Sequence, residues 1–135
     1  MAADITKVSP SMDTVQANQV AAGNLYAGEA LAVAAPCYIK ASDGLVYMSD
    51  GSSNNEVAKF VGFTARATAV GEPVTLFGYG TRFKYGSGLT PGAIYYISGT
   101  TGALYDVATT GDTKGTAMAV SATDIVVCRV DPKNG

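Results

Sequence analysis

The side chains that could do chemistry are eleven acidic residues and two cysteines, because the chain contains no histidine. Without histidine, the Ser-His-Asp and Cys-His arrangements of covalent catalysis are excluded. A pair of carboxylates could still hydrolyse a glycosidic bond, with one group acting as the acid. Most of the acidic residues lie where turns are expected, and turns favour such side chains: Asp43, Glu72, Asp112 and Asp124. This pattern predicts a protein that is not an enzyme.

The two cysteines, Cys37 and Cys128, lie far apart in the apolar runs APCYI and IVVCRV. Free cysteine often packs as a small buried hydrophobe, so we predict two reduced core thiols rather than a disulfide. Two thiols without histidine cannot form a zinc site of the usual type. The Gly-rich stretch GYGTRFKYGSG fits no nucleotide-binding fingerprint, and DGSSNNE lacks the spacing of a calcium loop. We therefore expect no metal and no cofactor.

Charge is sparse and scattered along the chain. Nine Lys and Arg oppose eleven Asp and Glu, and charged residues make up 15% of the composition, against about 25% in a typical soluble domain. A protein that binds a phosphate backbone usually concentrates its basic residues, so we expect no direct nucleic-acid partner. Low charge suits a subunit whose surface is largely covered by neighbours, although it also occurs in free β-proteins.

One short stretch, TRFKY, alternates Arg82 and Lys84 with Phe83 and Tyr85. Successive side chains on a strand point to opposite faces, so the two cations would share one face and the two rings the other. The simplest interpretation is a half-exposed strand. The functional interpretation is a partner-contact site that includes Arg82, Lys84 and Tyr85.

A repeat sets the organisation of the chain. YIKASDGLVY is nearly written again as YISGTTGALY, with the tyrosines, the isoleucine and the glycine at a constant spacing (96 − 38 = 58). Each copy has the pattern of a strand, a tight turn that ends in glycine, and a second strand. The repeat therefore predicts two related β-hairpins, at 36–49 and at 93–107.

The remaining elements are also short β-type runs bounded by Gly, Pro and Asp. They are expected at 59–67, at 74–80 with a continuation through 81–86, at 115–120 and at 125–130. Gly62 and Gly115 start equivalent strands at a shorter spacing (115 − 62 = 53), so the second copy has lost five loop residues. No helix is expected, and the fold class is all-β, a small barrel or sandwich. We predict one domain, 23–135, with a duplication over about 28–80 and 86–131.

Residues 1–22 differ from this pattern, because single apolar residues alternate with polar ones and Pro10 would interrupt a helix. We predict an extended N-terminal arm. It is either a loose terminus or a segment that docks on a partner or a neighbouring subunit through Ile5, Val8, Met12 and Val15.

The start of the chain lacks the basic and apolar regions of a secretory signal. The longest nearly unbroken apolar stretch, ALAVAAPCYI, is shorter than the ~18 residues that a membrane helix needs. We expect a soluble protein made in the cytoplasm, with no membrane partner.

Two long stretches carry a family resemblance. The segments YAGEALAVAAPCYIKASDGLVYMSDG and VGFTARATAVGEPVTLFGYG resemble tailed-bacteriophage capsid decoration (cement) proteins. The segments GLTPGAIYYISGTTGALYD and GTAMAVSATDIVV resemble a β-module of phage head-decoration, head-fibre and tail-fibre proteins. The resemblance covers about 26–130. The second hairpin module departs from plain cement proteins and leaves open a role at the base of a fibre.

The resemblance implies a small β-barrel or β-tulip fold, often trimeric, on the exterior of a virion. The implied partners are the major capsid protein and further copies of the same chain. The implied function is stabilisation of contacts between capsid subunits, and the family has no catalytic residues to carry over. The alternative function is a fibre or receptor-binding module that recognises a host-surface glycan or protein.

Overall fold

The computed structural model describes residues 3–16, 19–21 and 25–129. Over these residues the fold is all-β, as predicted, with one turn of 3-10 helix, η1 (Glu56–Ala58), and no α-helix. The strands are β1 (Asp4–Ile5), β2 (Lys7–Gln16), β3 (Gln19–Ala21), β4 (Pro36–Ile39), β5 (Val46–Met48), β6 (Gly62–Thr64), β7 (Leu76–Phe77), β8 (Arg82–Gly86), β9 (Ile94–Ile97), β10 (Leu104–Tyr105), β11 (Ala117–Ala119) and β12 (Asp124–Val127).

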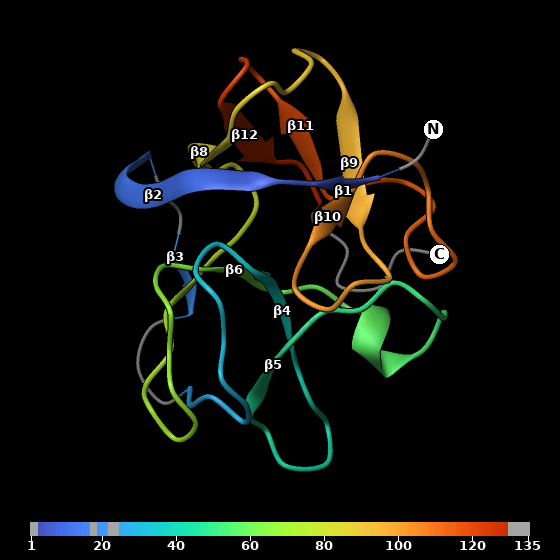
Figure 1. Ribbon diagram of the computed structural model, residues 1–135. Helices are drawn as coiled ribbons and strands as arrows, with labels where there is room; N and C mark the ends of the chain where they lie inside the picture. The colour runs from blue at the N-terminus through green and yellow to red at the C-terminus, as the bar shows by residue number, and fades with distance from the viewer. Residues whose placement is uncertain (1–2, 17–18, 22–24, 130–135) are drawn as a thin grey trace.

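The strands form two sheets that lie one above the other in Figure 1. The five-stranded sheet has the order β3-β7-β6-β4-β5, and the seven-stranded sheet has the order β1-β10-β9-β11-β12-β8-β2. Strands β3–β7 and strands β8–β12 follow the same pairing scheme. In each set the first strand pairs with the last, the last with the fourth, the fourth with the second, and the second with the third. The duplication is therefore a repeat of five strands.

The two predicted hairpins share one register. Tyr38 is opposite Tyr47 in the β4–β5 hairpin, and Tyr96 is opposite Tyr105 in the β9–β10 hairpin. The turn of the first hairpin contains Gly44 at φ 72°, and the second turn contains a glycine at φ 78°. This left-handed backbone costs glycine little, because glycine has no Cβ. The repeated glycine therefore fixes the same turn twice.

The structure extends and corrects the predicted boundaries. By strand pairing the units run over 19–77 and 82–127, so each begins with a short strand that precedes its hairpin. The expected continuation of 74–80 into 81–86 is wrong, because β7 and β8 lie in different sheets and Gly80 turns the chain between them at φ 86°. Gly62 is opposite Cys37 as Ala117 is opposite Tyr95, so the spacing is 117 − 62 = 55 rather than 53.

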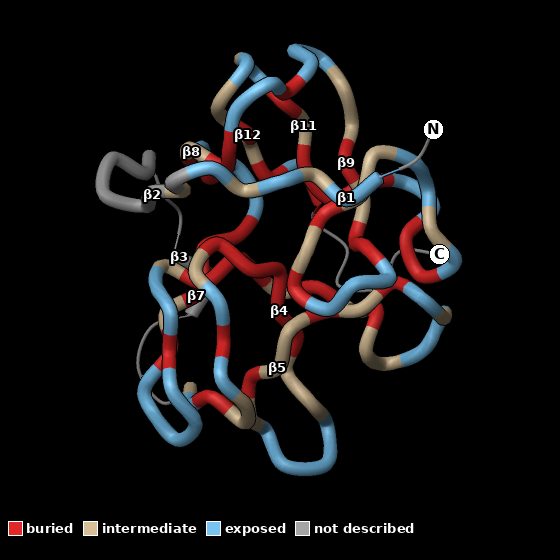
Figure 2. The backbone as a smooth tube through the Cα atoms, in the orientation of Figure 1, coloured by how far each residue is buried: buried red, intermediate tan, exposed pale blue. Residues whose placement is uncertain are grey.

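The larger core joins the two units. Phe60, Phe63 and Phe77 of the first unit pack with the buried residues of the second. The rings of Phe63 and Phe83 meet at 5.2 Å and 60°, an edge-to-face contact across the junction. In Figure 2, buried segments of both sheets accordingly lie toward the middle of the molecule. A smaller cluster around Cys37 fills the first unit alone.

The segment predicted as an arm is extended, and it is part of both sheets of its own chain. Strand β1 pairs with β10, β2 pairs with β8, and β3 pairs with β7. Thr6 alone separates β1 from β2, although these strands form opposite edges of the seven-stranded sheet. One continuous segment thus lies on both edges and nearly closes this sheet into a barrel (Figure 1).

Candidate functional site

The structure places the alternating stretch on β8 with the predicted orientation. Arg82 is exposed and Lys84 is half-buried on one face, whereas Phe83 and Tyr85 are buried on the other. The Arg82 Nε atom lies 3.2 Å from the Asp124 carboxylate of the neighbouring strand. Tyr85 has an exposed fraction of 0%, so its assignment as a partner contact is wrong. Its ring fills the core because the inner face of this sheet packs on the first unit.

Strand β2 lies directly beside these cations. Ser11 is opposite Lys84 and Gln16 is opposite Arg82, with a register shift between the two pairs. The positions of Met12 and Val15 therefore fall between the two cations along the edge, although their side chains lie outside the part that the structure describes. Positions predicted as contacts from two distant segments of the sequence are therefore neighbours at this edge of the sheet.

The two remaining predicted contact residues, Val8 and Ile5, lie in different environments. Val8 has an exposed fraction of 42% and faces solvent on β2. Ile5 is partly buried and packs against the main core, so it holds β1 in place rather than facing a partner. The solvent-accessible residues of this site are Val8 and Arg82, which are exposed, and Lys84, which is half-buried; we call these three the β2–β8 face.

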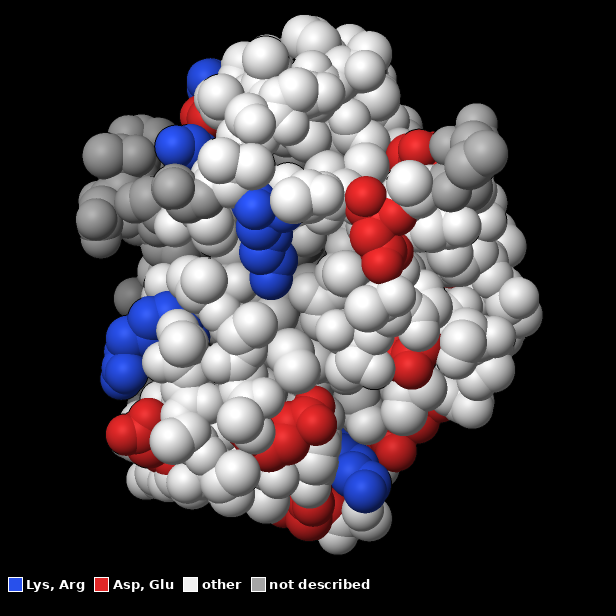
Figure 3. Space-filling view, viewed as in Figure 1, with Lys and Arg blue, Asp and Glu red and all other residues white. Residues whose placement is uncertain are grey.

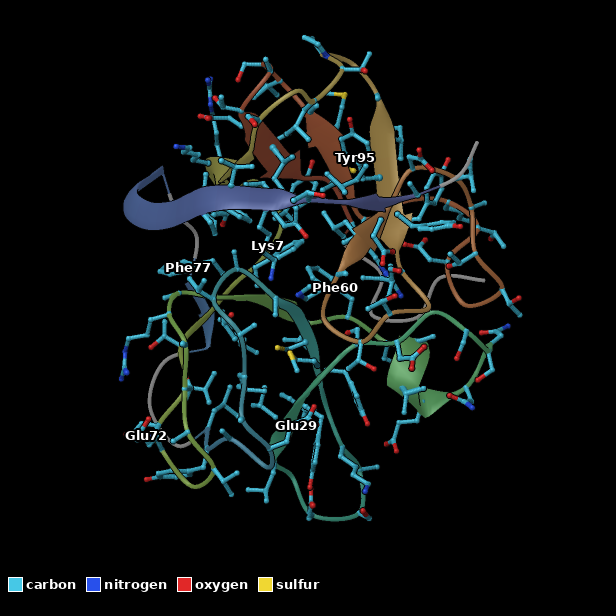
Figure 4. All side chains as sticks on the ribbon, viewed as in Figure 1. Lys7, Glu29, Phe60, Glu72, Phe77 and Tyr95 are labelled. Carbon is cyan, nitrogen blue, oxygen red and sulfur yellow. The ribbon has the colours of Figure 1, made fainter. Side chains whose placement is uncertain are left out.

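Lys7 fastens the N-terminal segment to both units. Its Nζ atom donates to the carbonyl oxygen of Val33 at 2.9 Å and to that of Gly102 at 3.4 Å. The same atom lies 5.8 Å from the centre of the Tyr85 ring. Figure 4 shows the side chain pointing from the N-terminal strand into the junction between the sheets. Burial lowers the pKa of this ammonium group, and the nearby Cys37 side chain acts in the opposite direction.

A buried ion pair stabilises the far side of the junction. The Arg129 Nη1 atom lies 3.8 Å from the Asp112 carboxylate, and both side chains are almost completely buried. Asp112 also accepts hydrogen bonds from the backbone of Ile97 and Gly115 and from the Thr116 hydroxyl. Sequence reasoning treated Asp112 as an ordinary turn residue. Only its full burial distinguishes it from the other turn carboxylates.

Arg129 continues this network into the first unit. Its Nη2 atom donates to the carbonyl oxygen of Ala58 at 3.3 Å, and its guanidinium lies 5.7 Å from the centre of the Phe60 ring. The contacts tie the end of the second unit to the segment around η1. This network positions the two sheets.

The other two turn carboxylates behave as predicted. Asp43 accepts hydrogen bonds from the Leu45 backbone and from the Tyr47 hydroxyl, and these bonds lower its pKa. Glu72 accepts a hydrogen bond from the Ala69 backbone. In both turns the carboxylate accepts hydrogen bonds from residues close to it in the sequence.

The cysteines differ from each other. Cys37 is buried, as predicted, and desolvation followed by the nearby Glu29 carboxylate raises its pKa far above the usual range. Cys128 is exposed, so its predicted place in the core is wrong. Val127 faces inward at the end of β12, and the alternation of the strand turns the next side chain outward. Neither thiol forms a disulfide.

Most of the surface visible in Figure 3 carries no charge, and its acidic side chains lie mainly on the lower and right-hand parts of the view. Within the described ranges, no group of three or more His, Cys, Asp and Glu side chains is placed to hold a metal ion. No helix in the described residues is long and apolar enough to cross a membrane. Comparison with models of known protein families and with curated proteins gives no match.

Proposed function

We propose that this protein decorates the outside of a viral capsid and stabilises contacts between major capsid protein subunits. The β2–β8 face carries this proposal. It combines an exposed apolar side chain, Val8, with the cations Arg82 and Lys84 on strands whose other face is anchored in the core. The resemblance to phage decoration proteins in the sequence supports the same function.

The physical argument is that such a protein acts by contact alone. A capsid-binding protein needs a rigid surface, because flexible side chains and loops lose entropy on binding. Two units joined by an aromatic core and by the contacts of Arg129 with Ala58 and Phe60 provide that rigidity. Many weak contacts on one shell become strong together, because each bound copy raises the effective concentration of the next contact. We propose a trimer for the bound form, because the decoration proteins that the sequence resembles are often trimeric.

The test is to heat particles of the virus that encodes this chain, stripped of the protein and then refilled with it. We expect refilled particles to release their DNA at a higher temperature than stripped ones. Equal release temperatures at saturating protein would rule out a cement role. Electron microscopy of the refilled particles would locate the protein on the shell and count the copies in each cluster.

A matched pair of variants tests the β2–β8 face itself. Val8→Asp combined with Lys84→Glu reverses the chemistry of the face, and we expect capsid affinity to fall by about tenfold or more. Val70→Asp combined with Arg66→Glu makes the same kinds of change at two exposed positions of the first unit and should leave affinity unchanged. If both variants bind like the original chain, another surface contacts the capsid.

A further inference from the structure

A shallow pocket of about 420 Å³ lies where the second hairpin meets the first unit. Its walls are the β9–β10 turn, the loop that follows β10, and a short piece of the loop after β5. Backbone bonds from Gly51 to Ser98 and from Gly111 to Gly51 hold these three segments together. The residues that matter below are Gly51, Ser52, Ser98, Thr100, Tyr105 and Thr110. No charged side chain lines the pocket.

The duplication provides an internal comparison for Tyr105, the aromatic residue of this pocket. Its counterpart in the first unit is Tyr47, which is fully engaged within the fold. The Tyr47 hydroxyl donates to Asp43 at 2.7 Å, and the Lys40 Nζ atom lies 5.0 Å from the ring centre. The ring also lies against Gly28, where an added Cβ would come within 2.3 Å of a ring carbon.

The second unit has lost every one of these contacts. Ser98 stands at the position of Lys40, and Thr101 stands at the position of Asp43. Gly86, the counterpart of Gly28, lies against the backbone of Thr6 instead of a tyrosine ring. Among the residues that the structure describes, no aromatic ring or cation packs on the Tyr105 ring, and the Tyr105 hydroxyl forms no hydrogen bond. Tyr47 therefore packs within its own hairpin in the first unit, whereas Tyr105 lines an open pocket in the second.

The hydroxyl groups that line the pocket fall into two sets, those bonded within the fold and those available to a ligand. Ser98 and Thr109 belong to the first set, because their hydroxyls donate to Asp4 and to the Ile97 carbonyl oxygen. The side chains of Ser52, Thr100 and Thr110 form no hydrogen bond with any other described residue. The pocket therefore presents one aromatic ring and a set of neutral groups that can both donate and accept.

We propose that this pocket binds a neutral saccharide. A sugar ring presents an apolar C–H face, which suits an aromatic ring, and hydroxyls, which suit Ser and Thr. The volume is within the range of about 300–1,000 Å³ that is usual for small-ligand sites. Asp4 accepts a hydrogen bond from the Ser98 hydroxyl, and Asp50 accepts one from the Ser52 backbone, so two carboxylates lie next to the lining. Their charge disfavours acidic sugars.

The probes are neutral sugars (glucose, galactose and N-acetylglucosamine, with their short oligomers) and sialic acid as the anionic comparison. We expect millimolar dissociation constants for at least one neutral sugar, because an open site contacts few ligand atoms. The backbone amide signals of Gly99, Thr100 and Thr110 should shift on titration in NMR spectra of the full chain. Sialic acid should bind at least about fivefold more weakly. No shift at these amides with any neutral sugar would overturn the proposal.

Two variants make the test specific to the pocket. Tyr105→Ala removes the ring and should weaken binding by about tenfold or more. Thr110→Val keeps the shape, leaves the strands untouched and removes one hydroxyl, so it serves if the first variant fails to fold. Tyr26→Ala, at an exposed tyrosine of the first unit, is the control and should bind like the original chain. Equal affinity in all three variants would place the sugar elsewhere and contradict the assignment.

The outcome is separable from the capsid test. The pocket lies on β10, the loops on either side of it and the loop after β5, whereas the capsid variants change β2 and β8. A chain that binds sugar and fails to bind capsids would support the fibre or receptor-binding function. A chain that binds capsids and ignores every neutral sugar would leave the cement function standing alone.

Discussion

Ala34 and Gly92 occupy the same place in the two units, and both have a left-handed backbone, with φ of 52° and 85°. Their amides make equivalent bonds, from Ala34 to the carbonyl oxygen of Thr64 in β6 and from Gly92 to that of Ala119 in β11. Ala34 is the only described residue other than glycine with a positive φ. The duplicated fold requires this conformation, and one unit meets it with a residue that is strained there.

The strain at this position can be measured directly. An added Cβ at Gly92 meets no atom within 4 Å, so Gly92→Ala changes the backbone energy and little else. We expect this variant to lose about 1–2 kcal/mol of unfolding free energy, measured by urea denaturation. Ala34→Gly relieves the same strain and gives up one buried methyl, worth about 0.8 kcal/mol, so it should leave stability unchanged or raise it by up to about 1 kcal/mol. A neutral Gly92→Ala together with a destabilised Ala34→Gly would contradict the assigned conformation.

The buried pair of Asp112 and Arg129 should be far more sensitive than the surface pair of Arg82 and Asp124. Arg129→Met leaves a carboxylate buried without its cation, and we expect a loss of about 3–5 kcal/mol of unfolding free energy. Arg82→Met breaks a pair whose arginine side chain is 53% exposed, and it should cost less than about 1 kcal/mol. Similar losses in the two variants would show that the network around Asp112 does not hold the units together.

The hairpins could be predicted because their signal is local. Four residues form each turn, and the glycine at the last of these positions has a positive φ in both copies. The sheet partners of strands β3 and β8 could not be predicted, because each of these strands pairs with a strand at the other end of its unit. A short strand carries too little pattern to reveal such a distant partner. The same limit hid the incorporation of the N-terminal segment into both sheets.

The candidate site was predictable in part. Alternation along 81–86 gave the correct faces for Arg82, Lys84 and Phe83, because period two is a property of any strand. Burial of Tyr85 depends on the packing of the other unit, which no local pattern contains. Asp112 was missed for the same reason, since TGDTKG reads as a loop until Arg129 approaches from the end of the chain. The Tyr105 pocket became visible only through comparison of the two units.

Lys7 should make stability depend on pH in the alkaline range. Burial lowers its pKa in the folded protein below the ordinary lysine value of 10.5. Between the folded and the unfolded pKa the unfolded chain binds more protons, so the free energy of unfolding contributed by this group rises with pH there. The effect is constant below the folded pKa and complete above 10.5. In denaturation experiments it appears as a difference between the original chain and Lys7→Met that grows as the pH rises toward 10.5.

Subtraction of the two curves removes the other groups that titrate in this range. Burial raises the pKa of Tyr38, and tyrosines of this kind lower stability as pH rises above their unfolded value. They are present in both proteins and cancel in the difference. A difference that stays flat or shrinks up to pH 10.5 would mean that the Lys7 ammonium is not desolvated at the junction.

The N-terminal strands should protect two separate edges of the seven-stranded sheet. Deletion of 1–5 removes β1, and we expect faster amide hydrogen exchange in β10 alone. Deletion of 1–16 also removes β2 and should expose β8 in the same way. Each backbone bond lost costs roughly 1 kcal/mol. The longer deletion also leaves two unpaired edges, so it should aggregate where the full chain stays in solution.

Gly86→Ala tests the same closure without removing any residue. An added Cβ at this position would lie 2.4 Å from the carbonyl oxygen of Thr6, the residue between β1 and β2. Because backbone is in the way, the N-terminal segment must shift, and protection should fall in β10 and β8 together. Gly99→Ala adds a methyl where the nearest atom is 3.7 Å away, and it should leave exchange in both strands unchanged. If β8 and β10 keep full protection in Gly86→Ala and in the longer deletion, the N-terminal segment does not close this sheet.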